Sequence, residues 1–287
     1  MKRLLSLLLL TLGVLVACLT FSPKTWAITY GFVDTNNTFS NVGAFIIKSP
    51  TGEISPICSG TMITANVFLT ASHCTSYFNQ DLAPQGYTAY VSLDQAIPFG
   101  ALTSNTTTLF SVAQVVTNPN YSQRQNDSRD IGVLILDQSV PNVTPAELPS
   151  CGLLDELSAR NGLKSAIFTN AGYGIQNRVV GGGVPFFEDL NPIPRMFSYS
   201  GFNALNGGFL RLSQNPATGN GGTCFGDSGG PNSLTVNGQQ LIVSVTITGD
   251  SVCRSTNVAY RLDTVSAQGF LAYVNAAFGT SIPVTCF

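Results

Sequence analysis

Ser228 is the residue of this chain best suited to act as a nucleophile. It lies in the run Gly226-Asp227-Ser228-Gly229-Gly230-Pro231, between glycines that leave room for a substrate backbone. Such a turn also lets successive backbone N–H groups point at one spot, as a developing oxyanion requires. The run predicts acyl-transfer chemistry on a serine hydroxyl, although a tight turn without function would have the same composition.

The position of histidine separates the possible serine-based arrangements, because the chain has a single one, His73, and it precedes Ser228. The G-x-S-x-G nucleophile elbow of α/β-hydrolases needs a histidine after the serine, and none follows Ser228. The subtilisin order needs an aspartate before the histidine, where only Asp34 lies, in a polar turn. The order that remains is His, Asp, Ser.

Three sequence blocks in that order resemble the chymotrypsin/trypsin family of serine endopeptidases. The histidine block runs from Cys58-Ser59-Gly60-Thr61-Met62-Ile63 to Leu69-Thr70-Ala71-Ser72-His73-Cys74, with Ser72 where the family usually has alanine. The aspartate block is Asp130-Ile131-Gly132-Val133-Leu134, and the serine block is Gly226 to Pro231. The resemblance covers residues 28–279 and implies two antiparallel β-barrels in series.

The resemblance implies a role for each member of a catalytic triad. Ser228 would attack the scissile carbonyl, His73 would take its proton and return it to the leaving amine, and Asp130 would orient His73. The N–H groups of Gly226 and Ser228 would form the oxyanion hole. Other aspartates also lie between the histidine and the serine, and two of them, Asp127 and Asp137, are interpreted as solvated turn residues.

An activation pair is also implied by the resemblance. In this family the aspartate before the nucleophile binds a free N-terminal ammonium, which shapes the oxyanion hole. Ile28-Thr29-Tyr30-Gly31 resembles the family's mature N-terminus, so Ile28 and Asp227 are the expected pair. Cleavage after Ala27 would yield the activating amine directly, without a separate propeptide.

Two further stretches resemble family segments that surround the substrate, but each lacks the tryptophan that the family has there. Val243-Ser244-Val245-Thr246 resembles the Ser-Trp-Gly strand, whose serine hydrogen-bonds the catalytic aspartate. Ala171-Gly172-Tyr173-Gly174 resembles the Gly-Trp-Gly block.

The expected primary pocket lacks the acid that attracts Arg or Lys in trypsin. Gly222, six residues before the nucleophile, would lie at its base, with Thr223 beside it. Thr246 and Val258 stand where glycines keep the family pocket open. We therefore predict a preference for small or medium apolar P1 side chains, such as Ala or Val, unless the acid of the neighbouring loop, Asp250, turns toward the pocket.

The N-terminal segment predicts export. Lys2-Arg3 precedes an almost wholly apolar stretch, Leu4 to Phe21, and Thr25-Trp26-Ala27 ends the segment with a small residue suited to signal peptidase. An apolar stretch of about 18 residues could instead anchor the chain in a membrane. Leu15-Val16-Ala17-Cys18 also resembles a bacterial lipoprotein box, which would tether the chain through the lipidated Cys18 and make residues 18–27 a short propeptide.

Six cysteines follow this segment, an even number that predicts three disulfides in an exported chain. They lie at positions 58, 74, 151, 224, 253 and 286. From the residues alone 15 pairings are open, with Cys58–Cys74 the easiest local one. Cys58–Cys74 and Cys224–Cys253 match family disulfides, which leaves Cys151 to pair with Cys286.

Many short strands must position these groups. Short apolar stretches broken by Gly, Pro, Asn and Ser recur along the chain, and Ile131 to Leu136 suits a strand buried on both faces. Thr264 to Phe278 is the one convincing helix. We therefore predict an all-β protein of two six-stranded antiparallel β-barrels (chymotrypsin-like) with a short C-terminal helix.

The predicted domains are divided at a proline-rich joint. Residues 1–27 form the signal peptide. Residues 28–150 form the N-terminal barrel, which carries His73 and Asp130. Residues 151–287 form the C-terminal barrel, which carries Ser228 and the primary specificity pocket.

Composition and charge limit the classes of partner and cofactor that we expect. Removing residues 1–27 leaves 10 basic and 15 acidic residues, a net charge of −5, so no nucleic-acid partner is expected. Neither a C-x-x-C motif nor a calcium-like carboxylate spacing occurs, and no cofactor or metal is expected. We predict a secreted serine endopeptidase acting on protein or peptide substrates, subject to proteinaceous inhibitors, with membrane contact only if Cys18 is lipidated. The alternative is an inactive protease homologue that serves as a secreted binding module.

Overall fold

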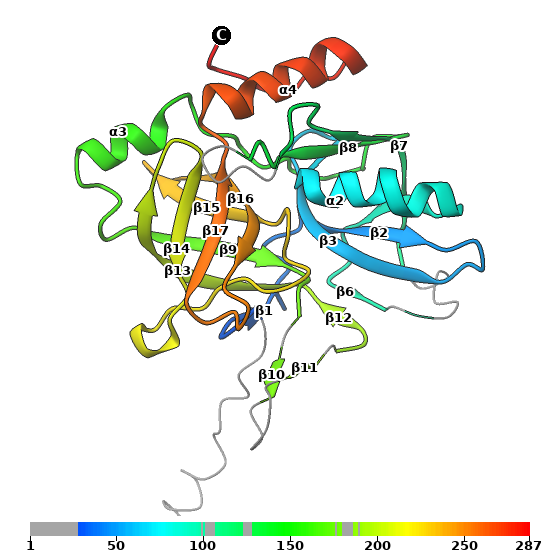
Figure 1. Cartoon of the computed structure of the whole chain (residues 1–287), viewed down its shortest axis with the longest axis horizontal. Helices are drawn as coiled ribbons and strands as arrows, with labels where there is room; N and C mark the ends of the chain where they lie inside the picture. Colours follow the sequence, from blue (N-terminus) through cyan, green and yellow to red (C-terminus); the bar gives the residue numbers. More distant parts are fainter. Residues whose placement is uncertain are drawn as a thin grey trace, which may run out of the picture.

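Two β-barrels dominate the computed structural model of the chain (Figure 1). The structure describes residues 28–98, 100, 107–122, 128–175, 177–179, 186–188 and 190–287. The predicted signal peptide, Cys18 with its lipoprotein-like box, and Asp127 lie outside these residues. Within the described ranges, no helix combines the length and the apolar character that crossing a bilayer requires.

The first barrel is a closed ring of six antiparallel strands. Its strands, in ring order, are β2 (Val42–Lys48), β3 (Ile54–Met62), β4 (Val67–Thr70), β8 (Gly132–Leu136), β7 (Phe110–Thr117) and β5 (Thr88–Ser92). Every residue of β4 and β8 is buried, as the continuous apolar run from Ile131 predicts. Phe45, Phe68 and Leu134 are among the fully buried side chains that fill this barrel.

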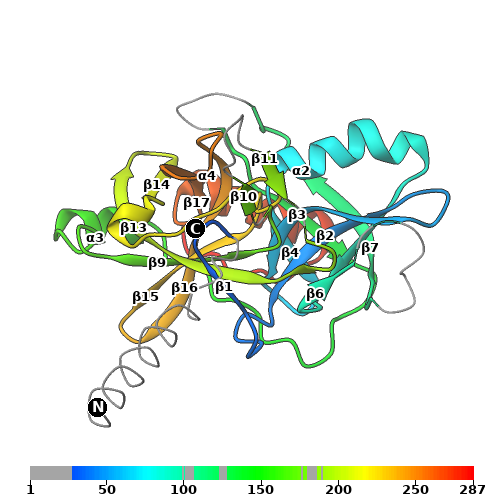
Figure 2. The same ribbon diagram turned by 90° about the horizontal axis from the view of Figure 1, so that it is seen from below.

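The second barrel is also a closed ring of six antiparallel strands, since β13 pairs with both β14 and β9. Its strands, in ring order, are β13 (Met196–Leu205), β14 (Phe209–Ser213), β17 (Thr256–Arg261), β16 (Gln239–Gly249), β15 (Pro231–Val236) and β9 (Ile167–Gly172). The predicted fold of two six-stranded barrels is therefore confirmed, and Figure 2 shows the two barrels side by side.

Short strands join the barrels to each other and to the start of the described chain. β1 (Phe32–Val33) extends the second sheet by pairing with β13, and β12 (Ile193–Pro194) pairs with β6 (Ala96–Ile97) across the two halves of the chain. The remaining small elements are β10 (Asn177–Val179), β11 (Phe186–Glu188), a π-helical turn (Phe78–Leu82) and two 3₁₀ turns (Ala83–Gln85 and Pro216–Thr218). The residue boundary between the two domains stays a prediction.

In the described part of the chain, three α-helices accompany the barrels: α2 (Ser72–Tyr77), α3 (Leu153–Ala159) and α4 (Val265–Phe278). The predicted C-terminal helix is confirmed, with the Thr264 hydroxyl accepting from the Ala267 N–H at 3.1 Å at its start. Gly279, with φ of +67°, ends α4 in a left-handed conformation that glycine adopts readily. The helices α2 and α3 have only six and seven residues, too few for a clear helical period in the sequence.

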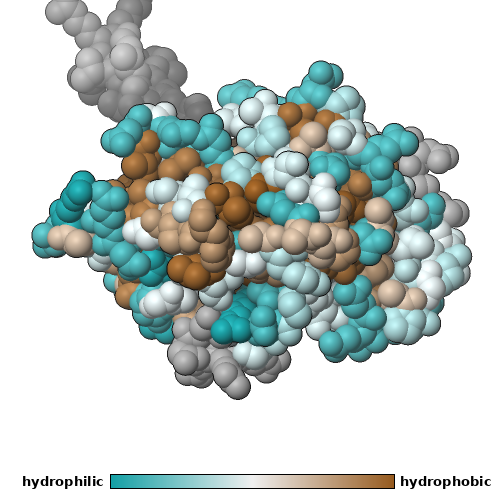
Figure 3. All heavy atoms as spheres, turned by 90° about the horizontal axis from the view of Figure 1, so that it is seen from above, coloured by the Kyte–Doolittle hydropathy of each residue, from teal (hydrophilic) through white to brown (hydrophobic). Residues whose placement is uncertain are grey.

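Helix α4 packs over the junction of the barrels. One buried cluster contains Leu69 and Val133 of the first barrel, Tyr260 of the second, and Phe270 and Leu271 of α4. The outer side of α4 keeps Val265, Tyr273 and Phe278 exposed, and Figure 3 shows apolar residues gathering across this face of the molecule. The shared core therefore fixes one barrel against the other.

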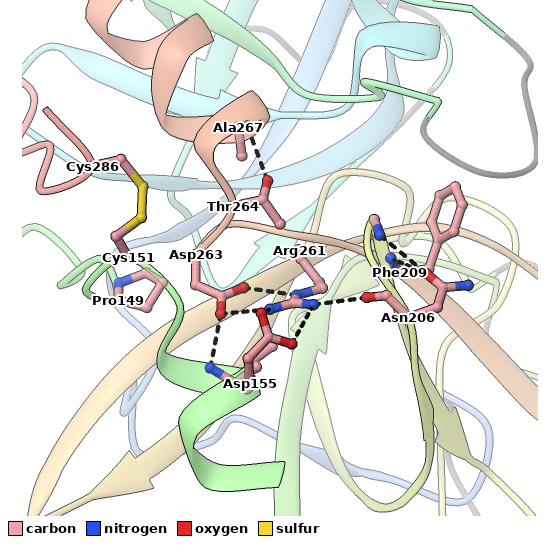
Figure 4. A network of polar contacts seen from close by, with 12 residues as sticks. Pro149, Cys151, Asp155, Asn206, Phe209, Arg261, Asp263, Thr264, Ala267 and Cys286 are labelled. Atoms are coloured by element: carbon pink, nitrogen blue, oxygen red, sulfur yellow. Dashed lines mark hydrogen bonds and ion pairs between the residues drawn. A yellow bond between two sulfur atoms is a disulfide. The ribbon is translucent and has the colours of Figure 1, made fainter. Parts of the chain in front are cut away.

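The three predicted disulfides are all formed, Cys58–Cys74, Cys151–Cys286 and Cys224–Cys253. Beside Cys151, the buried Arg261 holds α3 to the end of β17 (Figure 4). Its guanidinium donates to both carboxylate oxygens of Asp263, at 2.9 and 2.8 Å, and to those of Asp155, at 3.1 and 2.8 Å. Asp263 also accepts from the Leu154 N–H at 2.8 Å, so this ion pair organises the start of α3.

Replacing Arg261 by methionine should lower the free energy of unfolding by about 3–5 kcal/mol, because the buried Asp263 carboxylate loses its cation. The matched control is Arg160→Met, which removes an exposed pair with Glu156 and should cost less than about 1 kcal/mol. Denaturant unfolding of both variants measures the difference. Equal losses in the two variants would contradict this role for Arg261.

Candidate active site

The His73 and Asp130 side chains meet because their strands are neighbours. His73 follows β4 and Asp130 precedes β8, and these two strands pair with Thr70 opposite Gly132. Asp130 Oδ1 accepts from the His73 backbone N–H at 2.8 Å, and Oδ2 lies 2.9 Å from the ring Nδ1. Asp130 is buried, whereas about a third of the His73 side chain is exposed. The carboxylate therefore holds both the backbone and the ring of the histidine and leaves its other ring nitrogen available.

Ser72 has a structural role at this point. Its hydroxyl donates to the Ile131 carbonyl at 2.7 Å and accepts from the Asn118 N–H at 2.9 Å. The serine is fully buried, so both bonds offset the loss of its hydration. The departure from the family's usual alanine thus adds a tie between the residue before His73 and the residue after Asp130.

The Ser228 loop owes its shape to glycine. Gly226 has φ of +93° and Gly229 has φ of +80°, both in the left-handed region. A Cβ on Gly226 would lie 2.9 Å from the Gly174 Cα, and one on Gly229 would overlap Thr70. The Ser228 carbonyl accepts from the Ser59 N–H at 2.9 Å, which fixes the loop against the first barrel.

Two backbone N–H groups of this loop are available to a ligand. Within the described residues, those of Gly226 and Ser228 donate no hydrogen bond. The neighbouring N–H groups of Asp227, Gly229 and Gly230 all donate to carbonyls. The loop therefore presents free donors at the two positions where an oxyanion hole is predicted.

Ser228 lies where the two barrels meet. Its carbonyl is 4.0 Å from Sγ of Cys74, the residue after His73, and the Ser228 residue is half-buried. No hydrogen bond links its hydroxyl to His73 among the described residues. Catalytic hydrogen bonds are often long in ligand-free enzymes and shorten when substrate binds.

Asp227 is fully buried beneath the same loop. Its carboxylate accepts from the Gly174 and Cys224 N–H groups, both at 2.9 Å. A Cβ on Gly172 or Gly174 would overlap this carboxylate, which explains the glycines of that block. Burial raises the pKa of Asp227 to about 7, and no cation pairs with it among the described residues.

Ile28 is fully buried, although the structure does not pair it with Asp227, since Ile28 is still joined to Ala27 by a peptide bond. It packs against Met196, and the next carbonyl, of Thr29, accepts from the Gly222 N–H at 3.0 Å. The predicted mature N-terminus thus lies beside the predicted pocket base, and the activation pair stays a prediction.

A buried arginine holds the segment that follows Ile28. Arg195 Nε donates to Asp34 at 2.9 Å, and its Nη1 donates to the carbonyls of Val42 and Leu93 at 3.1 and 3.0 Å. Nη1 also reaches the Tyr173 hydroxyl at 3.3 Å. Burial raises the pKa of Tyr173 far above its ordinary value, so the phenol stays protonated and donates to a backbone carbonyl. This network connects the segment that follows Ile28 to the Ala171–Gly174 block, which packs against the Asp227 carboxylate.

Two neighbouring cavities border the Ser228 loop and His73. The smaller has about 150 Å³ and is lined by Thr223, Ser228, Thr246 and the Cys224–Cys253 disulfide, among others. The larger has about 510 Å³ and is lined by His73 and Asp130 together with β14 and β17 residues. Ile247 and Thr248 line both cavities.

The predicted substrate-binding residues divide between these cavities. Thr223 and Thr246 line the smaller one, while Val258 lines the larger one instead. Gly222 and Ser244 line neither cavity.

A residue that the sequence analysis did not find, Gln214, lies behind Gly222. A Cβ on Gly222 would overlap the buried Gln214 side chain, which accepts from the Thr223 N–H at 2.8 Å. Gln214 had no recognisable signal in the sequence, because strand pairing brings it there.

The expectation that Ser244 supports Asp130 is wrong for this structure. The Ser244 hydroxyl is buried and makes no hydrogen bond among the described residues. Thr246, two positions later, is the residue that contacts the Ser228 loop, with its N–H donating to the Gly230 carbonyl at 2.9 Å and its carbonyl accepting from the Gly229 N–H at 2.7 Å. A shift of two residues keeps the same face of a strand, so the sequence pattern could not separate them.

Asp250 lines the smaller cavity and is held by its own loop. Burial raises the pKa of Asp250, but hydrogen bonds from the Thr256, Arg254 and Ser255 N–H groups and from the Gln214 amide outweigh that effect and lower it. The carboxylate is therefore charged and already has four donors.

One group of potential metal ligands occurs at this junction. Atoms of Cys58, His73 and Cys74 lie within 4.8 Å of one another. Both sulfur atoms belong to the Cys58–Cys74 disulfide, so neither is a thiolate that could bind a metal ion.

The two barrels, with a histidine–aspartate pair at their junction, have the chymotrypsin-like fold. A family model described as Trypsin matches residues 31–181, which is more than half of the chain. The chain therefore belongs to the trypsin family of serine proteases. The matched range includes His73 and Asp130 and ends before Ser228, so the role of that serine depends on the geometry of its loop.

The stability of the uncleaved chain should report the isolated charge of Asp227. The folded state binds the proton more tightly than the unfolded state, whose pKa is near 3.8, so the free energy of unfolding should fall as pH rises from about 4 to about 7. The total fall should be up to about 4 kcal/mol. Denaturant unfolding across this range, on a chain with residues retained before Ile28, measures it.

The control is Asp227→Asn, which cannot titrate and should show a flatter profile. Parallel profiles for the two proteins would contradict the raised pKa.

Proposed function

We propose that this protein is a secreted serine endopeptidase that hydrolyses peptide bonds through an acyl-enzyme on Ser228. The observation that carries the proposal is the two-point contact of Asp130 with His73, beside a serine loop with two free N–H groups. Membership of the trypsin family gives the same reaction class and makes proteins or peptides the substrates.

In the proposed mechanism, Ser228 attacks the scissile carbonyl while His73 accepts the hydroxyl proton. Asp130 keeps the ring oriented and stabilises its charged form. The N–H groups of Gly226 and Ser228 bind the oxyanion, and loss of one such donor typically costs about 3 kcal/mol of transition-state stabilisation. His73 then protonates the leaving amine, and water releases the acyl group by the reverse sequence.

Activation is proposed to depend on cleavage before Ile28. A new ammonium there would give Asp227 the cation that it lacks in the uncleaved chain. Two observations support this step: Asp227 is buried without a positive partner among the described residues, and the Thr29 carbonyl, next to Ile28, accepts from the N–H of Gly222, the predicted pocket base. Cleavage by signal peptidase would then produce active enzyme directly.

Secretion is supported by the chemistry of the cysteines. All six cysteines after residue 27 are in disulfides, which form and persist in oxidising compartments. The apolar N-terminal segment, with its basic start, gives the expected route out of the cell.

The proposed P1 preference is for small or medium apolar side chains. The cavity next to Ser228 has only about 150 Å³, and Thr223, Thr246 and Thr248 line its walls. Asp250 contributes a charge, but its oxygens are already bonded to the loop and to Gln214.

Labelling with a fluorophosphonate tests the nucleophile. We expect one covalent adduct by intact mass on a chain that begins at Ile28, and none on Ser228→Ala, because only an activated serine with a formed oxyanion hole reacts at a useful rate. Ser233 is the internal control, since it is a buried serine of the same chain and should stay unlabelled when the adduct is mapped by proteolysis. The absence of any adduct on the Ile28 chain would favour the inactive binding module instead.

A peptide library tests the pocket. We expect cleavage after Ala or Val to exceed cleavage after Arg or Lys by at least about tenfold in kcat/KM, because the pocket is narrow and its carboxylate, Asp250, is already bonded to four donors. Main cleavage after Arg or Lys would mean that Asp250 receives the P1 cation and would contradict the apolar preference.

A further inference from the structure

Arg211 is an exposed cation in the larger cavity of the candidate active site. It lies on β14, opposite Val258 of β17, and lines the cavity of about 510 Å³ that also contains His73 and Asp130. Phe209, Ile247 and Val258 give this cavity an apolar lining around the guanidinium.

The Arg211 side chain has no partner among the described residues: its guanidinium makes no hydrogen bond, ion pair or ring contact there. Four other arginines each have a partner. Arg195 and Arg261 bind buried carboxylates, Arg160 binds Glu156, and Arg254 lies over the Tyr30 ring at 5.6 Å. In a chain with more acidic than basic residues, a guanidinium that is unpaired among the described residues and lines the same cavity as His73 is not part of a general basic surface.

The two cavities together indicate which part of a substrate would reach Arg211. Ile247 and Thr248, at the end of β16, line both of them. A peptide that follows this strand with its P1 side chain beside Ser228 therefore places residues preceding P1 in the larger cavity. Their side chains meet the apolar lining and the Arg211 guanidinium.

We propose that Arg211 selects an acidic substrate side chain at one of the positions P2 to P4. This inference rests on the proposed endopeptidase function. A guanidinium can bind a carboxylate through two parallel hydrogen bonds, which a neutral amide cannot match. The carboxylate that lines this cavity is Asp130, and both its oxygens are bonded to His73, so it does not occupy Arg211.

The experiment compares peptides with Ala at P1 that differ only in Glu, Gln or Lys at P2, P3 or P4. At low ionic strength, Glu should exceed Gln by about three- to fivefold in kcat/KM at one position, as for a partly exposed ion pair. The difference should shrink in about 1 M NaCl, because salt screens exposed charges. Arg211→Gln should abolish the preference and Arg211→Glu should reverse it toward Lys.

The matched control is Arg160→Gln, which removes an exposed arginine that follows α3 and should leave the preference intact. Binding of the same peptides to Ser228→Ala, by fluorescence anisotropy, measures the preference without turnover. Equal Glu and Gln values at all three positions, or a Glu preference that survives in Arg211→Gln, would overturn the role of Arg211. Loss of turnover with a retained, Arg211-dependent binding preference would instead reject the proposed peptidase activity alone.

Discussion

The buried carboxylate of Asp227 is the constraint around which the candidate active site is built. It lies directly before Ser228, the proposed nucleophile, is fully enclosed, and accepts hydrogen bonds from the backbone N–H groups of Gly174 and Cys224. Because the carboxylate fills this space, Gly172 and Gly174 have no room for side chains. Its raised pKa reflects the cost of burying a charge without a cation. In the proposed activation step, a new N-terminal ammonium at Ile28 removes that cost.

The junction of the barrels determines the rest of the site's geometry. Pairing of β4 with β8 places Asp130 against His73, and the Ser59 N–H brings the serine loop of the second barrel to the first. The cluster beneath α4 contains side chains from both barrels, so neither can shift without disturbing a common core. The geometry of a serine site that is divided between two barrels thus depends on one packed interface.

Arg195, Arg211 and Arg261 illustrate two physical situations of an arginine in the described part of the chain. Arg195 and Arg261 are buried, and each holds a segment in place through carboxylates and carbonyls. Arg211 is exposed and unpaired among the described residues, and it lies in a cavity that substrate would enter. All three residues are arginines, so the sequence alone does not distinguish them. Their burial and their neighbouring groups decide which cation is structural and which is available to a ligand.

The fold class, the C-terminal helix and the three disulfides could be predicted before any coordinates. The helix follows from a local pattern and the number of disulfides from the even cysteine count, whereas the residues alone left 15 pairings open and the resemblance to the chymotrypsin/trypsin family supplied the pairing. The order of His73, Asp130 and Ser228, within family-like blocks, likewise named the candidate triad. Other features became visible only in the folded chain: Thr246 rather than Ser244 meets the serine loop, and Gln214 lies behind Gly222. These contacts depend on strand register and barrel closure, which join residues distant in the chain and leave no local signal.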